Sequence, residues 1–354
     1  MPSFRDTILR LYRQLVSGSE RPTTLAAGSE LFLDGSSAIA VCEAAITGIA
    51  TTCGSQFSAT SEVAWRSEQA RLGRTLLGDR LQNLGTEGPR GAMAAAMGLA
   101  LAGERATLFI SGADLGAMPD LLTSAVERHL PLVIHMTTQD QSHTLSGGDD
   151  AISLAAQSGC TTLVAESVQQ AVDFTLIARR VAESSLTPVV VVIDSQQTAA
   201  SGQNVTLPTL ELVAQYVGQD GDKLTINDSA QRIIFGETRR RVPRWHDLDR
   251  PTMHGALHNS DTMGLLSASR AQFFGQNIEE ILDEAMNELN RLCGRDYSTI
   301  KAHAVAKADS LIIAEGAAIQ QARTVAAGFK KLKVGVVALY ARQPINRTEL
   351  VKLI

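Results

Sequence analysis

Short apolar runs alternate with stretches of helical character along most of the chain. Four runs are largely apolar and short enough to be buried strands rather than helices. They are 107–110, 130–136, 161–164 and 188–194. The segments beside them predict helices at 91–102, 118–128, 150–158 and 167–184. Buried strands that alternate with helices predict an α/β fold with a parallel sheet that helices cover on both faces.

The regular pattern begins near Phe32. Asp34 and Ser36 are candidate N-caps of a helix of small apolar residues that we expect to run to Ile49. A break at 51–55 and a charged helix from Ser58 to about Leu77 follow. Functional groups in parallel sheets lie in loops beyond the carboxyl ends of the strands. The loops expected there are 51–57, 111–116, 137–149 and 195–203.

The alternation is lost over 195–270, where the composition becomes polar. His254 and His258 lie four residues apart there, but Gly255 and the absence of a helical pattern disfavour a shared metal. The densest basic cluster, Arg239 to Arg241, is interpreted as a solvated loop rather than a phosphate-binding patch.

A second regular region begins near Asn277 with an amphipathic helix that extends to Cys293. A strand at 310–316, a helix at 317–329 and a strand at 334–340 form an expected βαβ unit. The unit looks unfinished at Ile354, which suggests a fragment or a subunit that a partner completes. The predicted organisation is an extension at 1–28, a first α/β domain at 29–205, a connector at 206–270 and a smaller α/β domain at 271–354, which is incomplete on this interpretation.

Composition excludes several classes of function. The chain has 354 residues, 44% of them hydrophobic, and a formal net charge of −5, which disfavours nucleic acid as a partner. No window of about 18 apolar residues predicts a membrane span. The four cysteines form no CxxC pair, so no zinc or iron–sulfur motif is present, and they fit a reducing cytoplasm. Dinucleotide-binding, P-loop and nucleophile-elbow motifs are also absent from the sequence.

The most informative stretch is LGTEGPRGAMAAAMGLALAGERATLFI, residues 84–110. A tight turn holds Glu87 at the start of a helix made almost entirely of small residues. Glu87 is the only charged group that this apolar helix could hold inside. One interpretation is a helix-start acid that is favoured by the helix dipole and paired with Arg90, one turn later. The other is a functional carboxylate.

Five segments together resemble a known family. They are LGTEGPRGA (84–92), SVQQAVDFTLIA (167–178), MHGALHNSD (253–261), LCGRDY (292–297) and VALYARQPI (337–345). In this order and at these spacings they resemble the N-terminal part of pyruvate:ferredoxin oxidoreductase and related 2-oxoacid:ferredoxin oxidoreductases. The resemblance runs from about Leu33 to Arg342.

The resemblance implies a thiamin diphosphate enzyme. Its first domain would bind the cofactor's pyrimidine, with Glu87 and Gly88 at the site, and its second would resemble the transketolase C-terminal domain. In the family, a glutamate at this position hydrogen-bonds the aminopyrimidine ring and favours its imino form, which takes the proton from the thiazolium C2 carbon. An apolar site would give such a carboxyl group the raised pKa that this task favours.

Two positions depart from the family pattern. The family's substrate loop, Tyr-Pro-x-Thr-Pro-Ser, falls on 52–57, where Ser55 keeps a hydroxyl group but both prolines are replaced. The arginine expected to pair with the substrate carboxylate falls on Gln139, which can hydrogen-bond but carries no charge. Arg90 and His143 are nearby substitutes in the sequence. The departures mean a different substrate, a different carboxylate-binding group or a degenerate copy.

The chain lacks the GDG…NN-type motif that binds the diphosphate and its Mg²⁺, and it lacks ferredoxin-type cysteines. The resemblance therefore implies half of a thiamin diphosphate site in this chain. Mg²⁺ and iron–sulfur clusters would then lie on other domains or subunits of a homo- or hetero-oligomer. Such an enzyme would convert a pyruvate-type 2-oxoacid to an acyl-CoA by oxidative decarboxylation, and this chain alone would be inactive. The alternatives are a non-catalytic scaffold subunit that retains the fold and a transketolase-like carboligase.

Overall fold

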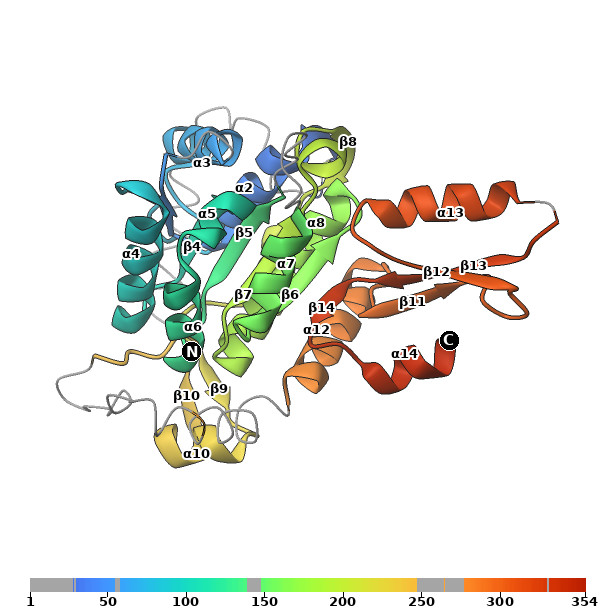
Figure 1. The fold of residues 1–354 in the computed structure, drawn as a ribbon. Helices are drawn as coiled ribbons and strands as arrows, with labels where there is room; N and C mark the ends of the chain where they lie inside the picture. Colours follow the sequence, from blue (N-terminus) through green and yellow to red (C-terminus); the bar gives the residue numbers. More distant parts are fainter. Residues whose placement is uncertain are drawn as a thin grey trace.

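The computed structural model describes residues 28, 30–54, 58–138, 148–246, 264, 277–329 and 331–354. Its centre is a seven-stranded sheet in the order β14-β6-β7-β5-β4-β2-β3 (Figure 1). The strands are β2 (Ile49–Thr52), β3 (Gln82–Gly85), β4 (Ala106–Ser111), β5 (Val133–Thr137), β6 (Thr161–Ala165), β7 (Val189–Ile193) and β14 (Ala341–Gln343). All neighbours are parallel except β14, which pairs antiparallel with β6. The predicted α/β class is confirmed.

Strand β7 shows why helices cover both faces of the sheet. Its five residues, VVVVI, are all buried. Successive side chains of a strand point to opposite faces. Val189 and Val191 accordingly join one core cluster, and Val190 and Val192 join another. The continuous apolar run is therefore the signature of a strand buried on both sides, as the sequence predicted.

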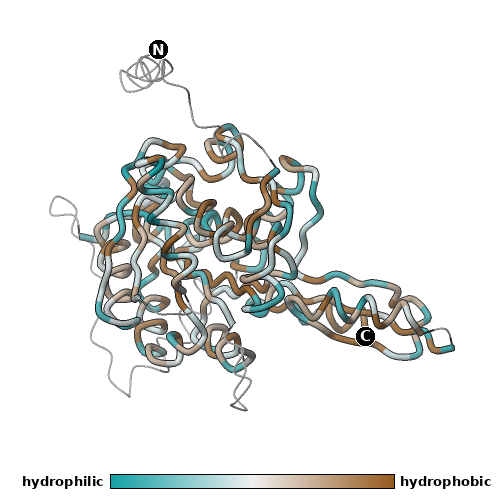
Figure 2. The backbone as a smooth tube through the Cα atoms, turned by 90° about the horizontal axis from the view of Figure 1, so that it is seen from above, coloured by the Kyte–Doolittle hydropathy of each residue, from teal (hydrophilic) through white to brown (hydrophobic). Residues whose placement is uncertain are grey.

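Two groups of helices enclose these cores (Figure 1). One face packs against α2 (Gly35–Ile46), α3 (Ala59–Leu72), α8 (Val168–Ser185) and α12 (Ile278–Cys293). The other packs against α4 (Gly88–Ala102), α5 (Gly112–Gly116), α6 (Pro119–Glu127) and α7 (Gly148–Gln157). The tube in Figure 2 shows many hydrophobic segments inside the body of the molecule and a thinner C-terminal part that extends away from it.

Local chemistry explains where the first helices begin and end. Asp34 is the N-cap of α2, as predicted, and its carboxylate accepts a hydrogen bond from the Ser37 amide at 2.9 Å. The predicted extension of this helix to Ile49 is wrong. α2 ends at Ile46, and the β-branched run Ile49–Thr52 forms strand β2 instead. Helix α3 is shorter than predicted because Gly73, in the left-handed region at φ +65°, caps it.

The loop predicted at 111–116 contains the short helix α5. Ser111 and Asp114 form a capping box there: the Ser111 side chain accepts from the Asp114 amide, and the Asp114 side chain accepts from the Ser111 amide. The capping box was present in the sequence, and it is the reason that this segment folds as a turn of helix.

The polar region after β7 also contains regular structure. Its elements are η1 (Ser195–Ala199), β8 (Gly202–Thr206), α9 (Leu210–Leu212), η2 (Val213–Val217), β9 (Lys223–Thr225), α10 (Ser229–Phe235) and β10 (Thr238–Arg240). Strand β8 pairs antiparallel with β1 (Glu30–Asp34), and β9 pairs antiparallel with β10. This region therefore contributes one strand to a small sheet with β1 and forms a second small sheet by itself.

The C-terminal part forms a three-stranded sheet in the order β11-β13-β12. Its elements are β11 (Ile300–His303), β12 (Ser310–Glu315), α13 (Ala318–Gly328), β13 (Val334–Leu339) and α14 (Arg347–Leu353). Strands β12 and β13 are parallel and joined through α13, so the predicted βαβ unit is confirmed. Only Tyr340 separates β13 from β14, so one extended segment contributes to both sheets.

Gly316 shows how closely the small sheet approaches the large one. It lies after β12 with φ +58°, and a Cβ atom there would come 3.0 Å from Cγ1 of Val164 on β6. Glycine is therefore required at this position by the backbone conformation and by the space available.

Candidate functional site

Glu87 lies at the carboxyl edge of the large sheet, in the tight connection between β3 and α4. It occupies the N-cap position of α4 with φ −82° and ψ 99°. Its side chain makes no capping hydrogen bond, and within the described residues its carboxylate has no hydrogen-bonding or ion-pairing partner. The side chain is exposed rather than held inside as the sequence had suggested.

The residue after Glu87 leaves space beside the carboxylate. Gly88 has φ +75°, and a Cβ atom built on it would meet no atom within 4 Å. Its lack of a side chain permits the turn and leaves the backbone accessible to a flat ligand. On the inner side, a Cβ atom on Gly91 would meet Cβ of Thr86 at 3.3 Å, so the turn is packed closely against the helix.

The turn that carries Glu87 is connected to the end of strand β2. The backbone amide of Thr86 donates to the carbonyl of Thr52 at 2.9 Å, and the Thr86 hydroxyl donates to the same carbonyl at 3.2 Å. Thr52 is the first residue of the predicted substrate loop. Glu87 and the base of that loop are therefore held next to each other at one edge of the sheet.

Helix α4 has one buried face and one exposed face. Its buried residues are Ala92, Met93, Ala96, Met97 and Ala100. The opposite face exposes small residues, including Ala94 and Gly98, and a Cβ atom on Gly98 would meet nothing within 4 Å. The small side chains therefore allow close approach of another surface to the exposed side of α4.

Arg90 does not pair with Glu87. Its guanidinium forms a bidentate ion pair with Asp120 on α6, with Nη1–Oδ1 at 2.7 Å and Nη2–Oδ2 at 2.8 Å. Hydrogen bonding by Arg90 lowers the pKa of Asp120 to about 2. The predicted local pairing of Glu87 with Arg90 is therefore wrong, and Arg90 is already engaged by a carboxylate of this chain.

The described part of the substrate loop comes together at Glu62. The backbone amide of Gly54 donates to Oε1 of Glu62 at 3.1 Å, and the Ser58 hydroxyl donates to the same oxygen at 3.1 Å. Glu62 is on α3 and only 4% exposed. The predicted substrate residues Ser55 and Gln139 lie outside the described residues, as do His143, His254 and His258.

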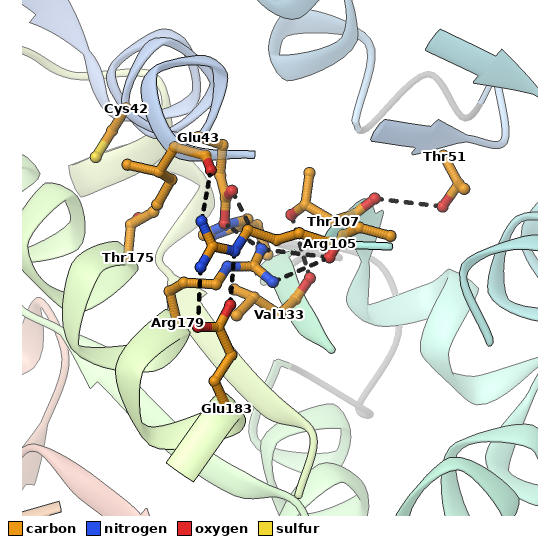
Figure 3. Close-up of polar contacts among 12 residues, drawn as sticks. Cys42, Glu43, Thr51, Arg105, Thr107, Val133, Thr175, Arg179 and Glu183 are labelled. Carbon is orange, nitrogen blue, oxygen red and sulfur yellow. Dashed lines mark hydrogen bonds and ion pairs between the residues drawn. The ribbon is translucent and has the colours of Figure 1, made fainter. Parts of the chain in front are cut away.

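A buried cluster of charges lies under the sheet, between α2, α8 and the start of β4 (Figure 3). Glu43 accepts a hydrogen bond from Nε2 of His135 at 2.8 Å and contacts Nη2 of Arg179 at 3.3 Å. Arg179 also donates to the Ala106 carbonyl at 3.2 Å. Burial alone would raise the pKa of Glu43, but Arg179 and His135 lower it to about 2.

A second buried ion pair lies beside the first. Arg105 and Glu183 form a bidentate contact with N–O distances of 2.7 and 3.0 Å, and Arg105 also donates to the carbonyls of Ile46 and Gly218. The charges of both pairs face each other across α2, α8 and the strands beside them, which is the pattern of a structural network. Neither pair reaches the edge of the sheet where Glu87 lies.

The basic run at 239–241 is not a solvated loop. Arg239 is 6% exposed and donates to the carbonyls of Glu183 and Ser184 at the end of α8, at 2.6 and 3.0 Å. Its Nε donates to Gln231 at 2.8 Å. Arginine side chains can satisfy the last carbonyls of a helix, which have no partner inside it. This cation therefore caps α8 and attaches the β9–β10 sheet to it.

The segments 167–178 and 292–297 contact each other directly. Asp173 on α8 accepts hydrogen bonds from Nη1 of Arg295 at 2.8 Å, the hydroxyl of Tyr297 at 2.5 Å and the Gln169 amide at 3.3 Å. Burial raises the pKa of Asp173 to about 6, against Arg295 and Tyr297, which lower it. The ring of Phe174 meets Tyr297 edge-on at 5.8 Å. These segments therefore join the C-terminal part to the large sheet.

A second polar cluster joins the same two parts. The hydroxyl of Tyr340 donates to Glu166 at 3.1 Å, and Nη2 of Arg323 contacts that hydroxyl at 2.8 Å and Nε2 of His303 at 2.7 Å. Glu166 directly follows β6, so the cluster lies at the carboxyl edge of the large sheet. It is separated from Glu87 by most of the width of the sheet, since β6 and β3 are near opposite ends of the strand order.

A cavity of about 500 Å³ lies between α8, α10 and α12, and Arg180, Gln231 and Glu284 are among the residues that line it. It lies near the C-terminal end of α8. That helix follows a parallel strand and runs antiparallel to it, so its end lies at the amino edge of the sheet. The cavity is thus distinct from the Glu87 edge.

Comparisons with known proteins decide the family. Residues 60–254, more than half of the chain, match the family model described as "Pyruvate flavodoxin/ferredoxin oxidoreductase, thiamine diP-bdg". The chain belongs to this family. The pyruvate flavodoxin/ferredoxin oxidoreductase match includes Glu87, Glu62 and Asp173, and it confirms the resemblance found in the sequence.

Relatives support the assignment. The chain is 24% identical over 281 residues to pyruvate synthase subunit PorA of Thermotoga maritima, covering 78% of this chain and 67% of that protein. It is 25% identical over 234 residues to PorA of Pyrococcus furiosus, covering 65% of this chain and 54% of the relative. The chain therefore spans between half and two thirds of the length of these PorA relatives.

A solved structure shows the same fold. The 2-oxoglutarate:ferredoxin oxidoreductase from Magnetococcus marinus, with 2-oxoglutarate, coenzyme A and succinyl-CoA bound, superposes with a TM-score of 0.61 at 16% identity. The superposition covers 92% of this chain and 56% of that one. The likeness in fold therefore extends over most of this chain.

The sequence singled out Glu87 but not Glu62, Glu43 or Asp173. A carboxylate four residues after Ser58, at the start of a helix that follows a loop, was a usable sign for Glu62. Glu43 and Asp173 had no local sign, because each contacts residues that lie far away in the sequence.

Proposed function

We propose that this chain is the pyrimidine-binding part of a thiamin diphosphate-dependent 2-oxoacid:ferredoxin oxidoreductase. The observation that carries the proposal is the position of Glu87 within the family match: an exposed carboxylate that caps no amide of α4, in the turn between β3 and α4 at the carboxyl edge of a parallel sheet. Ligands of α/β sheets bind at that edge. The reaction would be oxidative decarboxylation of a pyruvate-type 2-oxoacid to an acyl-CoA.

The residues present fit the pyrimidine half of the cofactor. The exposed Glu87 carboxyl group would hydrogen-bond the pyrimidine ring nitrogen, and Gly88 leaves open space next to it in the turn. Thiamin diphosphate, when bound, supplies the carbon nucleophile and the electron sink for decarboxylation. Glu87 would orient the ring and tune its protonation, while Thr86 and Thr52 hold the turn in place.

The diphosphate half of the cofactor needs another domain or subunit. Among the described residues, no group of three or more histidine, cysteine, aspartate or glutamate side chains could hold a metal ion. A partner that carries the diphosphate and Mg²⁺ site would cover the exposed Glu87 and the small-residue face of α4. We therefore propose that the chain acts in a homo- or hetero-oligomer and is inactive alone. Iron–sulfur clusters and a ferredoxin-type acceptor would belong to other components.

The substrate side of the proposal rests on Ser55 and Gln139 as residues that contact the 2-oxoacid. Arg90 is not available to replace the missing arginine, because Asp120 occupies both ends of its guanidinium. A substrate carboxylate would have to displace Asp120 from this guanidinium. A 2-oxoacid whose carboxylate is bound by neutral donors is therefore the proposed substrate.

Among the described residues, no helix has the length and apolar character needed to cross a bilayer.

The proposal is tested with the chain assembled with its diphosphate-binding partner. Glu87→Gln and Glu87→Ala should lower 2-oxoacid-dependent dye or ferredoxin reduction by about 10²–10⁴-fold, the range expected for loss of a general acid–base group. Glu104→Gln, at the exposed far end of α4, is the matched control and should retain activity. Full turnover in Glu87→Ala would refute the assignment. An assembled protein that binds no thiamin diphosphate would indicate a scaffold. Retained carboligation without electron transfer would indicate a carboligase.

A further inference from the structure

The Glu87 side chain does not fix its own direction. As the N-cap residue of α4 it makes no capping hydrogen bond to the helix, and it is exposed. The direction of this carboxylate therefore depends on the backbone turn between β3 and α4. A turn that orients a functional group must itself be held within about 0.5 Å of its position.

The Thr86 hydroxyl connects the elements on the two sides of this turn. Its oxygen lies 3.2 Å from the carbonyl oxygen of Thr52, at the end of β2, and 3.3 Å from that of Gly88, at the start of α4. A hydroxyl can donate its proton to either of two such acceptors. Glu87 lies between Thr86 and Gly88 in the sequence. This one side chain therefore links strand and helix across the residue whose carboxylate has to be oriented.

The end of strand β2 is a firm anchor for the turn. Strand β2 lies inside the large sheet, with β3 on one side and β4 on the other. Thr52 is 1% exposed, and its carbonyl also accepts a hydrogen bond from the Thr86 amide at 2.9 Å. The hydroxyl contact requires one side-chain rotamer of Thr86, and β-branched residues change rotamer only with difficulty. The contact therefore adds direction to what the amide bond alone would hold.

Helix α4 leaves room for the Thr86 side chain. A Cβ atom on Gly91 would lie 3.3 Å from Cβ and 3.4 Å from Oγ1 of Thr86. The shorter distance is tighter than ordinary contact, so alanine at position 91 would displace Thr86 by a few tenths of an ångström. Glycine is a poor helix former. The space that Thr86 occupies is therefore the reason for a glycine at this position of the helix.

We infer that the Thr86 hydroxyl positions Glu87, because it connects the end of β2 to the start of α4 and so sets the direction of the carboxylate between them. Thr86 acts through Glu87 and is a positioning residue. The inference rests on the proposed function, since only that function gives the direction of Glu87 a consequence for turnover. The effect of the hydroxyl on the turn itself is measurable in the chain without cofactor.

Three threonine variants isolate the hydroxyl. Thr86→Val removes it and keeps the shape of the side chain, whereas Thr86→Ser keeps it. In Thr86→Val the Thr52 carbonyl still accepts from the amide of position 86, so it is not left without a donor and the variant should fold. Thr107→Val is the matched control. Thr107 is fully buried on β4, and its hydroxyl also donates to a carbonyl of the neighbouring strand, that of Val133 at 3.2 Å.

Hydrogen exchange of the full chain, measured without cofactor, tests the contact. Amides of the peptide 84–92 should exchange several times faster in Thr86→Val, and at the wild-type rate in Thr86→Ser and Thr107→Val. Gly91→Ala should also raise exchange there, although alanine favours a helix more than glycine does. Gly328→Ala, at a position of α13 where a Cβ atom meets nothing within 4 Å, should not raise exchange in the peptide around it.

A double-variant cycle in the assembled complex tests whether the contact acts through Glu87. Thr86→Val should lower kcat about tenfold, within the loss of about 10²-fold that a misplaced group can cause. In a Glu87→Gln background the same change should lower kcat by less than about twofold, because the group that Thr86 orients has already lost its function. Thr86→Ser should keep kcat near that of wild type.

Each result supports or overturns the inference. Wild-type exchange in Thr86→Val, or a loss of kcat in Thr86→Ser as large as in Thr86→Val, would refute the role of the hydroxyl. Equal losses of kcat in the wild-type and Glu87→Gln backgrounds, or an equal loss in Thr107→Val, would show a structural effect alone and refute the positioning role. Full turnover in Glu87→Gln would overturn the proposed function and the catalytic step with it. Hydrogen exchange would then still decide whether the Thr86 hydroxyl holds the turn.

Discussion

The buried pair of Glu43 and Arg179 gives the sharpest prediction about the fold. Both side chains are fully buried, and their contact connects α2 to α8 beneath the sheet. Glu43→Gln preserves the shape of the side chain and its hydrogen bond to His135 but removes the negative charge. Arg179 would then be a buried cation without its compensating carboxylate. Breaking a buried pair in this way costs about 3–5 kcal/mol.

The pKa of Glu43 gives a second value for the contribution of this carboxylate to stability. The folded state lowers this pKa from 4.5 to about 2, and that difference corresponds to about 3 kcal/mol of stability. Because the folded pKa lies below the unfolded one, the stabilisation is complete above about pH 4.5 and disappears as the pH falls to about 2. The two magnitudes agree.

Urea unfolding measures both effects. Trp65 and Trp245 are buried in different cores, so their fluorescence reports on both faces of the sheet. At pH 7, Glu43→Gln should lower the free energy of unfolding by about 3–5 kcal/mol. The difference from wild type should shrink as the pH falls below 4.5. The double variant Glu43→Leu with Arg179→Met should be less destabilised than the sum of its single variants, because no charge remains unpaired.

A fall of less than about 1 kcal/mol in the free energy of unfolding of Glu43→Gln at pH 7, a change typical of an exposed pair, would refute this role of Glu43. The same difference in free energy of unfolding between wild type and variant at pH 3 and at pH 7 would also refute it. An additive double variant would show that Glu43 and Arg179 do not act on each other.

Three further predictions concern other contacts. The folded pKa of Asp173, about 6, lies above the ordinary 3.8, so its contribution to stability should fall by about 3 kcal/mol as the pH rises from 4 to 6. Asp173→Asn cannot titrate and should remove that fall, and parallel curves of unfolding free energy against pH for the two proteins would contradict the assignment. Arg239→Met should cost about 2–3 kcal/mol, because the Glu183 and Ser184 carbonyls lose a charged donor, and it should expose the β9–β10 sheet to limited proteolysis; an unchanged digestion pattern would refute the capping role. Arg90→Ala breaks only an exposed pair and should leave the free energy of unfolding close to that of wild type, and a clear loss in urea unfolding would show that Arg90 holds α4 to α6.

Local patterns were sufficient for the buried core of the large sheet. The run VVVVI at 189–193 could only be a strand covered on both faces, and Asp34 was recognisable as a helix cap because its side chain acts three residues away. Strand β2 was missed because IATT directly follows a helix of small apolar residues, and only its pairing with β3 and β4 shows it to be a strand.

Contacts between distant residues account for what the sequence did not show. Arg239 was interpreted as solvated because its partners, the last carbonyls of α8, lie 55 or more residues earlier. Strand β14 has only three residues, and nothing local indicates that it extends the large sheet beside β6. Glu87 was found because the turn residues around it are adjacent in the sequence. Glu62 was not found, since Gly54, whose amide donates to it, lies eight residues earlier.

The central claim is that this chain holds the pyrimidine half of a split thiamin diphosphate site. Calorimetric titration of thiamin diphosphate with Mg²⁺, into this chain alone and into the chain assembled with its partner, tests it most directly. We predict binding only in the assembly, and weaker binding when the assembly carries Glu87→Ala. An assembly that binds no thiamin diphosphate, or binds it equally well without Glu87, would contradict the account.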